Sequence, residues 1–185
     1  MSERVEIRED AADGPAARAL FDEYMALVCA RLPGFVPSER IFAREDAFAG
    51  DGGAWLVAYD AGGAPVGCGG LRTLAPGVGE IKRMFVVERA RGAGLGRRLL
   101  HELEQRAALR GHRCVRVVTT EVLREAIALY DADGYRVVRR TERAGEPVEI
   151  WMEKALGVEP GAGTSPTRTP PGPAGGRARG PRGGS

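Results

Sequence analysis

The chain has 185 residues, 43% of them hydrophobic, and a formal net charge of +2. This length suits a domain with a core of its own, and no apolar run approaches the length of a membrane-spanning helix. The cysteines Cys29, Cys68 and Cys114 lie far apart and form no CxxC pair, which argues against a disulfide framework and against a metal site. The charged N-terminus has no apolar segment behind it, so we expect a cytoplasmic protein without a membrane partner.

The last part of the chain differs in composition from the rest. From Gly157 onward it consists almost entirely of Gly, Pro, Ala, Ser, Thr and Arg, and such a segment buries too little apolar surface to fold. We therefore predict a folded domain over residues 1–156 and a disordered Gly/Pro/Arg-rich tail over 157–185. The tail arginines account for the positive net charge, so the charge argues against nucleic acid as a partner of the domain.

The first half of the chain predicts two helices and three strands. Residues 5–8 alternate apolar and polar side chains, as a short strand does, and a helix follows over 15–32 with proline in its first position. A second, shorter helix is expected over about 38–48. Strands over 55–59 and 66–74 are joined by a glycine-containing hairpin turn.

The second half predicts four strands and two helices. The strands are expected over 80–87, 115–119, 135–140 and 148–153, and the helices over 95–110 and 123–132. Gly111 and Gly134 follow the two helices, where glycine commonly ends a helix in a left-handed conformation.

A glycine-rich turn, residues 91–96, links an apolar strand to the helix that follows it. Backbone amides of such a turn can converge on a phosphate, because the helix N-terminus is partly positive and glycine has no Cβ atom to keep the ligand away. Two familiar phosphate turns do not fit. A P-loop ends in Gly-Lys-Ser/Thr, and the third glycine of a dinucleotide-binding turn would fall on Arg97 or Leu99.

The remaining pattern, Arg91-x-x-Gly94-x-Gly96, resembles the acetyl-CoA pyrophosphate motif of the GNAT superfamily of N-acetyltransferases. Further along, Ala126 to Tyr135 resembles the A-x-x-L-Y-x-x-x-G-F/Y segment of that family. The resemblance covers roughly residues 5–154. It implies an α/β (α+β) fold with a mixed, mostly antiparallel sheet of six to seven strands and about four helices, in which strands splay around acetyl-CoA.

The resemblance also implies how acetyl-CoA, the acetyl donor, is held. The pantetheine arm would lie as a pseudo-strand along the strand predicted over 80–87. That strand must then bend, for example at a bulge. The Met84 amide is the expected oxyanion donor, and Arg97 is expected at a phosphate, with a solvated first helical turn as its alternative. Many family members have an asparagine where this chain has Leu123. The implied cofactor-binding residues are Met84, Phe85, Val86, Arg91, Gly92, Ala93, Gly94, Leu95, Gly96 and Arg97.

Two residues are candidates for the proton transfers. Tyr130 matches the family tyrosine near the thioester sulfur and would be the general acid; the alternative is a tyrosine of the core. Glu80 begins the strand before the turn and would be the base that deprotonates the amine, often through water. Its alternative is a surface carboxylate at a strand end or a partner for Lys82.

The implied function is transfer of an acetyl group from acetyl-CoA to a primary amine by direct attack. Arg72, Lys82 and Arg83 point to an acidic acceptor, such as an amino acid or another small metabolite, although exposed strand charges would look the same. An acetyltransferase acting on a protein amine and a non-catalytic acetyl-CoA-binding regulatory module are the alternatives. The sequence leaves the oligomeric state open, a homodimer included.

Overall fold

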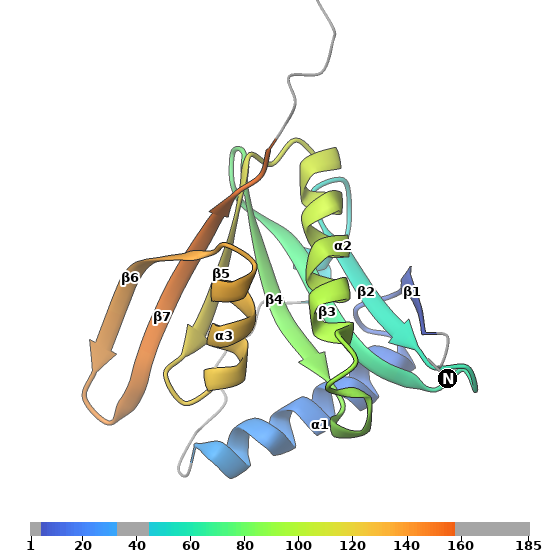
Figure 1. Cartoon of the computed structure of the whole chain (residues 1–185). Helices are drawn as coiled ribbons and strands as arrows, with labels where there is room; N and C mark the ends of the chain where they lie inside the picture. The colour runs from blue at the N-terminus through green and yellow to red at the C-terminus, as the bar shows by residue number, and fades with distance from the viewer. Residues whose placement is uncertain (1–4, 33–44, 158–185) are drawn as a thin grey trace, which may run out of the picture.

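The computed structural model describes residues 5–32 and 45–157, and within them one seven-stranded sheet with the order β1-β2-β3-β4-β5-β7-β6 (Figure 1). Strands β4 and β5 are parallel, and every other neighbouring pair is antiparallel. The predicted mixed, mostly antiparallel sheet is confirmed. The strands are β1 (Glu6–Glu9), β2 (Ala54–Tyr59), β3 (Pro65–Ala75), β4 (Val78–Val86), β5 (Cys114–Thr120), β6 (Arg136–Arg143) and β7 (Glu146–Ala155).

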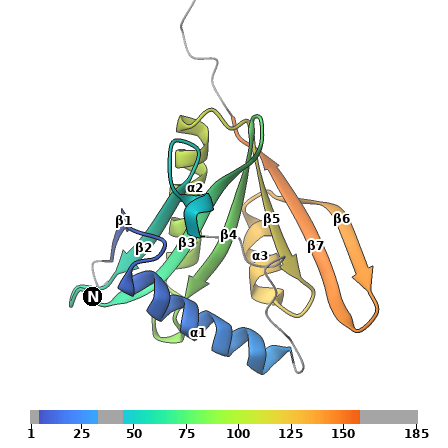
Figure 2. The same cartoon turned by 180° about the vertical axis from the view of Figure 1, so that it is seen from behind.

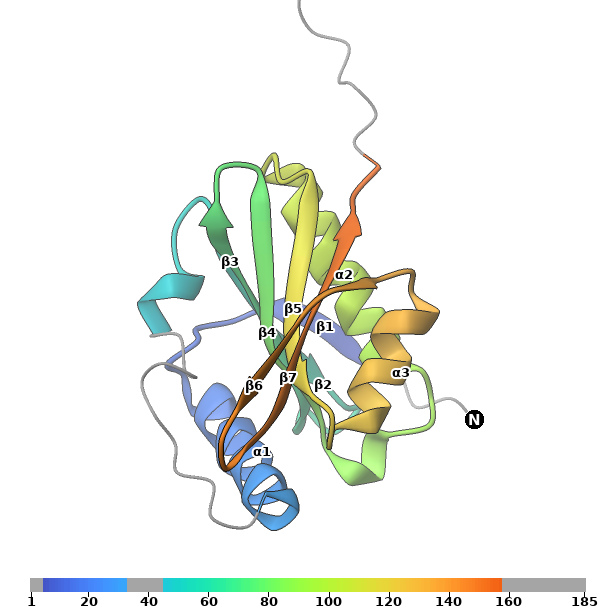
Figure 3. The same ribbon diagram turned by 90° about the vertical axis from the view of Figure 1, so that its left-hand side faces the viewer.

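The helices lie on both faces of this sheet. Helix α1 (Pro15–Arg31) covers one face, and α2 (Leu95–Leu109) and α3 (Arg124–Ala132) cover the other (Figures 2 and 3). Two short 3-10 turns, η1 (Glu45–Phe48) and η2 (Glu88–Ala90), complete the described elements. None of the helices in the described ranges is long and apolar enough to span a membrane.

About four helices were expected from the sequence. The described residues contain three α-helices, and the end of the expected second helix forms the 3-10 turn η1. The rest of that helix falls within 33–44, outside the described residues. The predicted tail, 157–185, also lies outside them except for Gly157.

Helix α2 packs closely on the sheet because β3 is rich in glycine. Leu99 and Leu103 are fully buried. A Cβ atom added at Gly67 would lie 3.1 Å from Leu99 Cδ1, and one added at Gly69 would lie 2.8 Å from Leu103 Cδ1. The leucine side chains therefore occupy the space that larger residues of β3 would fill, which fixes the distance between helix and sheet.

Strands β4 and β5 pair over only part of their length. Their ladder joins Val78–Ile81 to Cys114–Val117, although β4 continues to Val86. Beyond Ile81 the two strands diverge, as Figure 1 shows. The splay expected from the resemblance is present.

The bend of β4 after this ladder comes from a β-bulge. Gly69 of β3 faces two residues of β4, Arg83 and Met84, where a regular ladder would pair one residue with one. Arg83 has a φ of 55°, a conformation that residues with a side chain seldom adopt. The predicted bulge is thus present, at Arg83 and Met84.

Two leucines of α2 provide a test of this packing. Leu103→Ala should lower the free energy of unfolding by about 2–5 kcal/mol, because it leaves a cavity between α2 and β3. Leu109→Ala, at a side chain that is 86% exposed, should change it by less than about 0.5 kcal/mol. Urea unfolding followed by circular dichroism measures both. Equal effects of the two substitutions would contradict the packing described here.

Candidate functional site

The glycine-rich turn takes the form that a phosphate-binding turn requires. Gly92 and Gly94 have φ angles of 84° and 78°, which side-chain-bearing residues adopt only at a cost. Gly94 is the N-cap of α2, and the Arg98 amide donates to its carbonyl oxygen at 3.1 Å. A helix provides no internal acceptors for its first amides, so those that follow Gly94 are placed to bind an anion.

Arg91 fastens the turn to the end of β4. Its Nε donates to the Val86 carbonyl oxygen at 2.8 Å, and its guanidinium lies 5.8 Å from the centre of the Phe85 ring. The start of the turn is therefore held against the strand that precedes it. This contact gives Arg91 a structural role beside any contact with a ligand.

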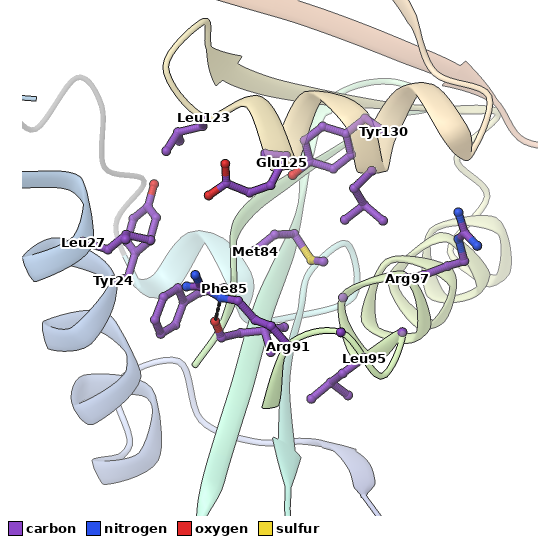
Figure 4. Close-up of a pocket in the computed structure, with 16 residues that line it drawn as sticks. Tyr24, Leu27, Met84, Phe85, Arg91, Leu95, Arg97, Leu123, Glu125 and Tyr130 are labelled. Carbon is purple, nitrogen blue, oxygen red and sulfur yellow. Dashed lines mark hydrogen bonds between the residues drawn. The ribbon is translucent and has the colours of Figure 1, made fainter. Parts of the chain in front are cut away.

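The turn forms one wall of a cavity of about 410 Å³. The other walls come from the end of β4, from α3 and from α1, and Figure 4 shows the residues that line it. The lining residues are Tyr24, Leu27, Met84, Phe85, Val86, Arg91, Gly92, Gly94, Leu95, Gly96, Arg97, Leu123, Glu125, Ala126, Leu129 and Tyr130. We call this space the turn cavity.

The turn cavity brings together most of the residues selected from the sequence. All the expected cofactor-binding residues line it except Ala93, which lies between two that do. Tyr130 lines it as well, whereas Glu80 does not. Leu123, at the position where the family often has asparagine, is the N-cap residue of α3 and makes no side-chain capping hydrogen bond.

Tyr130 reaches the cavity from α3. Tyr130 is 6% exposed, and the centre of its ring lies 5.5 Å from that of the Tyr135 ring. In Figure 4 the side chain points from the helix into the cavity, above Met84. Burial raises the pKa of the Tyr130 hydroxyl, and the nearby Tyr24 raises it further, so the phenol carries its proton at neutral pH.

Glu80 lies in a second cavity, also of about 410 Å³, between α1 and the face of the sheet. Tyr24 and Leu123 line both cavities, so the two are adjacent. The second cavity, which we call the sheet cavity, is lined by Tyr24, Val28, Leu32, Arg72, Leu74, Glu80, Lys82, Arg83, Val118, Thr119, Thr120, Leu123, Arg143, Glu149 and Trp151.

Glu80 is buried, 3% exposed, and is not the surface carboxylate that one interpretation of the sequence expected. Arg72 Nε donates to its Oε2 at 2.6 Å, from the directly opposite position on β3. Lys82 Nζ lies 3.7 Å from its Oε1. The partnership with Lys82 is therefore present, but Arg72 is the closer partner. The sequence missed this because it cannot show which residues face each other across strands.

Two further cations of the sheet cavity, Lys82 and Arg83, have surroundings that differ from those of Arg72. Burial lowers the pKa of Lys82, and the charge of Glu80 only partly offsets this effect. The Arg83 guanidinium lies 4.8 Å from the centre of the Phe21 ring and 5.4 Å from that of Phe48. The aromatic rings of α1 and η1 thus hold the side chain of the bulge residue.

Arg97 is placed by a residue that the sequence did not single out. Asp133, at the C-cap of α3, lies 3.2 Å from Arg97 Nε and 2.7 Å from His101 Nε2. Burial tends to raise the pKa of Asp133, but hydrogen bonds from His101 and Arg97 outweigh it and leave the pKa below its ordinary value. Arg97 therefore lines the cavity and is paired with a carboxylate, while its side chain remains 54% exposed, as the alternative of a solvated helical turn expected.

Two further residues of the turn cavity went unnoticed in the sequence. Tyr24 lies on α1, and burial raises the pKa of its hydroxyl. Glu125, in the first turn of α3, forms an ion pair with Arg31 at the end of α1. Apolar spacing marks the inner face of α1, but nothing in the sequence indicates which part of the fold that face meets.

The chain matches known acetyltransferases over most of this region. The model of the acetyltransferase (GNAT) family matches residues 18–135. An IAA acetyltransferase from Azospirillum brasilense is 38% identical over 96 residues, 51% of this chain and 63% of that protein. An uncharacterized N-acetyltransferase from Schizosaccharomyces pombe is 33% identical over 54% of this chain and 62% of its own length. The matches thus span less than two thirds of these relatives.

A solved structure shows the same fold. The GNAT-family acetyltransferase from Staphylococcus aureus superimposes with a TM-score of 0.67, over 83% of this chain and 99% of that protein, at 17% identity. The match of the family model includes the glycine-rich turn and the segment from Ala126 to Tyr135. This chain belongs to the acetyltransferase (GNAT) family.

Proposed function

We propose that this chain transfers an acetyl group from acetyl-CoA to the primary amine of a small molecule. One observation carries the proposal: the glycine-rich turn, the bulged end of β4 and the Tyr130 hydroxyl line the same cavity. A site for a phosphate, backbone groups for an extended arm and a protonated acid thus lie in one continuous space. The A. brasilense relative, named an acetyltransferase, supports the reaction type.

The turn and β4 provide the contacts for the donor. Amides from Gly92 to Gly96 would bind the pyrophosphate, with Arg97 held by Asp133 beside them. The backbone of residues 84–86 is available to the pantetheine arm because β5 has already diverged from β4. A Cβ atom at Gly92 or Gly94 would meet no other atom within 4 Å, so the turn faces open space. These features fit acetyl-CoA.

The reaction needs one oxyanion donor and two proton transfers. The amine nitrogen forms a bond to the thioester carbonyl carbon, and the bond from that carbon to sulfur breaks. The Met84 amide, at the bulge, would stabilise the charge that develops on the carbonyl oxygen. Tyr130 would give its proton to the leaving sulfur. Burial raises the pKa of this phenol, so Tyr130 enters the reaction in the protonated form that a general acid needs.

Glu80 would take the proton that the amine loses. Its carboxylate is held by Arg72 and lies close to Lys82, so we assign the transfer to a water molecule between Glu80 and the amine. Base and acid then act from two adjacent cavities, Glu80 from the sheet cavity and Tyr130 from the turn cavity. In this proposal the acceptor binds between α1 and the sheet, in a space of a size typical for small-molecule sites.

The reaction is tested by the release of CoA thiol from acetyl-CoA over a panel of primary amines, with and without enzyme. We expect release with at least one small amine and slower release with peptide N-termini. Turnover confined to peptides would assign the chain to protein acetylation. Tight binding of acetyl-CoA without turnover on any amine would instead support a regulatory module.

The general acid is tested by two matched substitutions. Tyr130→Phe should lower kcat about 100-fold or more, because the thiolate loses its proton donor, while the Kd for acetyl-CoA stays within about twofold. Tyr24→Phe removes the other phenol of the same cavity and should lower kcat much less. Stopped-flow kinetics and calorimetry measure the two quantities. The reverse ranking would assign the acid to Tyr24, and wild-type turnover of Tyr130→Phe would exclude Tyr130.

The base is tested by the pH dependence of kcat/KM. A base is active when deprotonated, so wild-type kcat/KM, calculated per neutral amine, should fall at low pH, and Glu80→Gln should lower the rate and remove this acidic limb. Glu149→Gln, at another carboxylate of the sheet cavity, should retain it. An acidic limb that survives Glu80→Gln would show that another group is the base.

A further inference from the structure

We infer that the sheet cavity accepts amines that also carry a carboxylate, and that Lys82 is the residue that recognises this carboxylate. The inference rests on the proposed function, because it concerns the acceptor of that reaction. It deepens the proposal by naming a substrate class: small amino-carboxylates with an apolar body, such as apolar α-amino acids.

The cavity carries more positive than negative side chains. Its lining includes four cations but only two carboxylates, namely Arg72, Lys82, Arg83 and Arg143 against Glu80 and Glu149. Arg143 is matched by Glu149, at 3.0 Å. The two cations nearest to Glu80, Arg72 and Lys82, share its single carboxylate. The group Arg72–Glu80–Lys82 therefore has a net charge of +1.

This excess charge is withdrawn from water. The side chains of Glu80 and Lys82 are 3% and 18% exposed. Taking a cation out of water is unfavourable unless a counter-charge accompanies it. The only carboxylate beside Lys82 in this group is that of Glu80, and Arg72 lies closer to it than Lys82 does. The lowered pKa of Lys82 has the same cause. A carboxylate on the ligand would supply the missing charge through a charge-assisted hydrogen bond to Nζ.

The position of Lys82 links this recognition to the reaction. Lys82 and Met84 lie two residues apart on β4, so their Cα atoms are at most about 7 Å apart, and Met84 belongs to the bulge that follows Lys82. An acceptor that binds Lys82 through its carboxylate reaches a thioester beside Met84 most directly when it is short and its amine lies near that carboxylate. Amino acids with both groups on one carbon satisfy this condition.

The opposite wall of the cavity is apolar. Val28 of α1 and Leu32, the C-cap residue of that helix, are buried there, and Leu74, Val118 and Trp151 add apolar lining on the sheet side. An acceptor with charged groups at one end and an apolar body at the other matches both walls. A peptide N-terminus lacks the neighbouring free carboxylate, because that group is part of the peptide bond.

The first test compares acceptors that differ only in this group. Initial rates of CoA thiol release are measured with leucine, leucinamide and isopentylamine, and with phenylalanine, phenylalaninamide and 2-phenylethylamine. In each set, the amino group of the amide is less basic than that of the amino acid, and the amino group of the simple amine is more basic. A difference in amine protonation therefore cannot make the amino acid react faster than both neutral compounds. We expect kcat/KM for the amino acids to exceed that for both neutral compounds by at least about tenfold.

Variants of Lys82 then assign this preference. Lys82→Met should reduce it to about twofold or less, mainly through KM, and Lys82→Arg, which keeps the charge, should retain most of it. Arg140→Gln, at an exposed arginine of β6 outside both cavities, serves as the control and should keep the wild-type preference. Equal or higher rates with the neutral amines, or a preference unchanged in Lys82→Met, would overturn the inference.

A binding measurement separates this inference from the proposed function. If no amine releases CoA thiol, the proposed function fails, and calorimetry with CoA present compares N-acetyl-leucine with N-acetyl-leucinamide. Tighter binding of the acid by at least about tenfold, lost in Lys82→Met, would still support the carboxylate site. Equal binding of the two compounds would overturn it.

Discussion

The incomplete pairing of β4 with β5 is the constraint on which the rest of the site depends. The ladder ends at Ile81, and the bulge at Arg83 and Met84 then turns β4 away from its neighbour. Backbone groups that a regular sheet would use internally are left for a ligand, and both cavities lie along the strand that bends away. The glycines of β3 contribute by letting α2, which follows the glycine-rich turn, pack closely on the sheet.

Charge is distributed unequally between the two cavities. The turn cavity has an apolar interior, with Arg91 and Arg97 near the turn and each tied to a neighbouring oxygen. The sheet cavity holds a buried cluster in which one carboxylate serves two cations. A donor with phosphates at one end and an apolar arm suits the first cavity, and a small charged acceptor suits the second.

The sequence predicted what local patterns determine. Alternating and helical spacing located the strands and α-helices of the described residues, and glycine spacing located the turn and therefore most of the lining of the turn cavity. Lys82 was a candidate partner of Glu80, but the contacts of Arg72 with Glu80 and of Asp133 with Arg97 could not be predicted, because these residues meet only after strands and helices pack. For the same reason, the sequence could not distinguish Tyr24 from the other residues on the apolar face of α1, although the fold places it at a cavity.

Tyr24 and Leu123 form part of both cavities, and this common boundary has a consequence for the order of events. A ligand in one cavity that fixes the side chains of Tyr24 and Leu123 also fixes part of the wall of the other cavity. The free energies of binding are then coupled, and the coupling is the same in either direction. We therefore expect the affinity of each cavity for its ligand to depend, through Tyr24 and Leu123, on whether the other cavity is occupied.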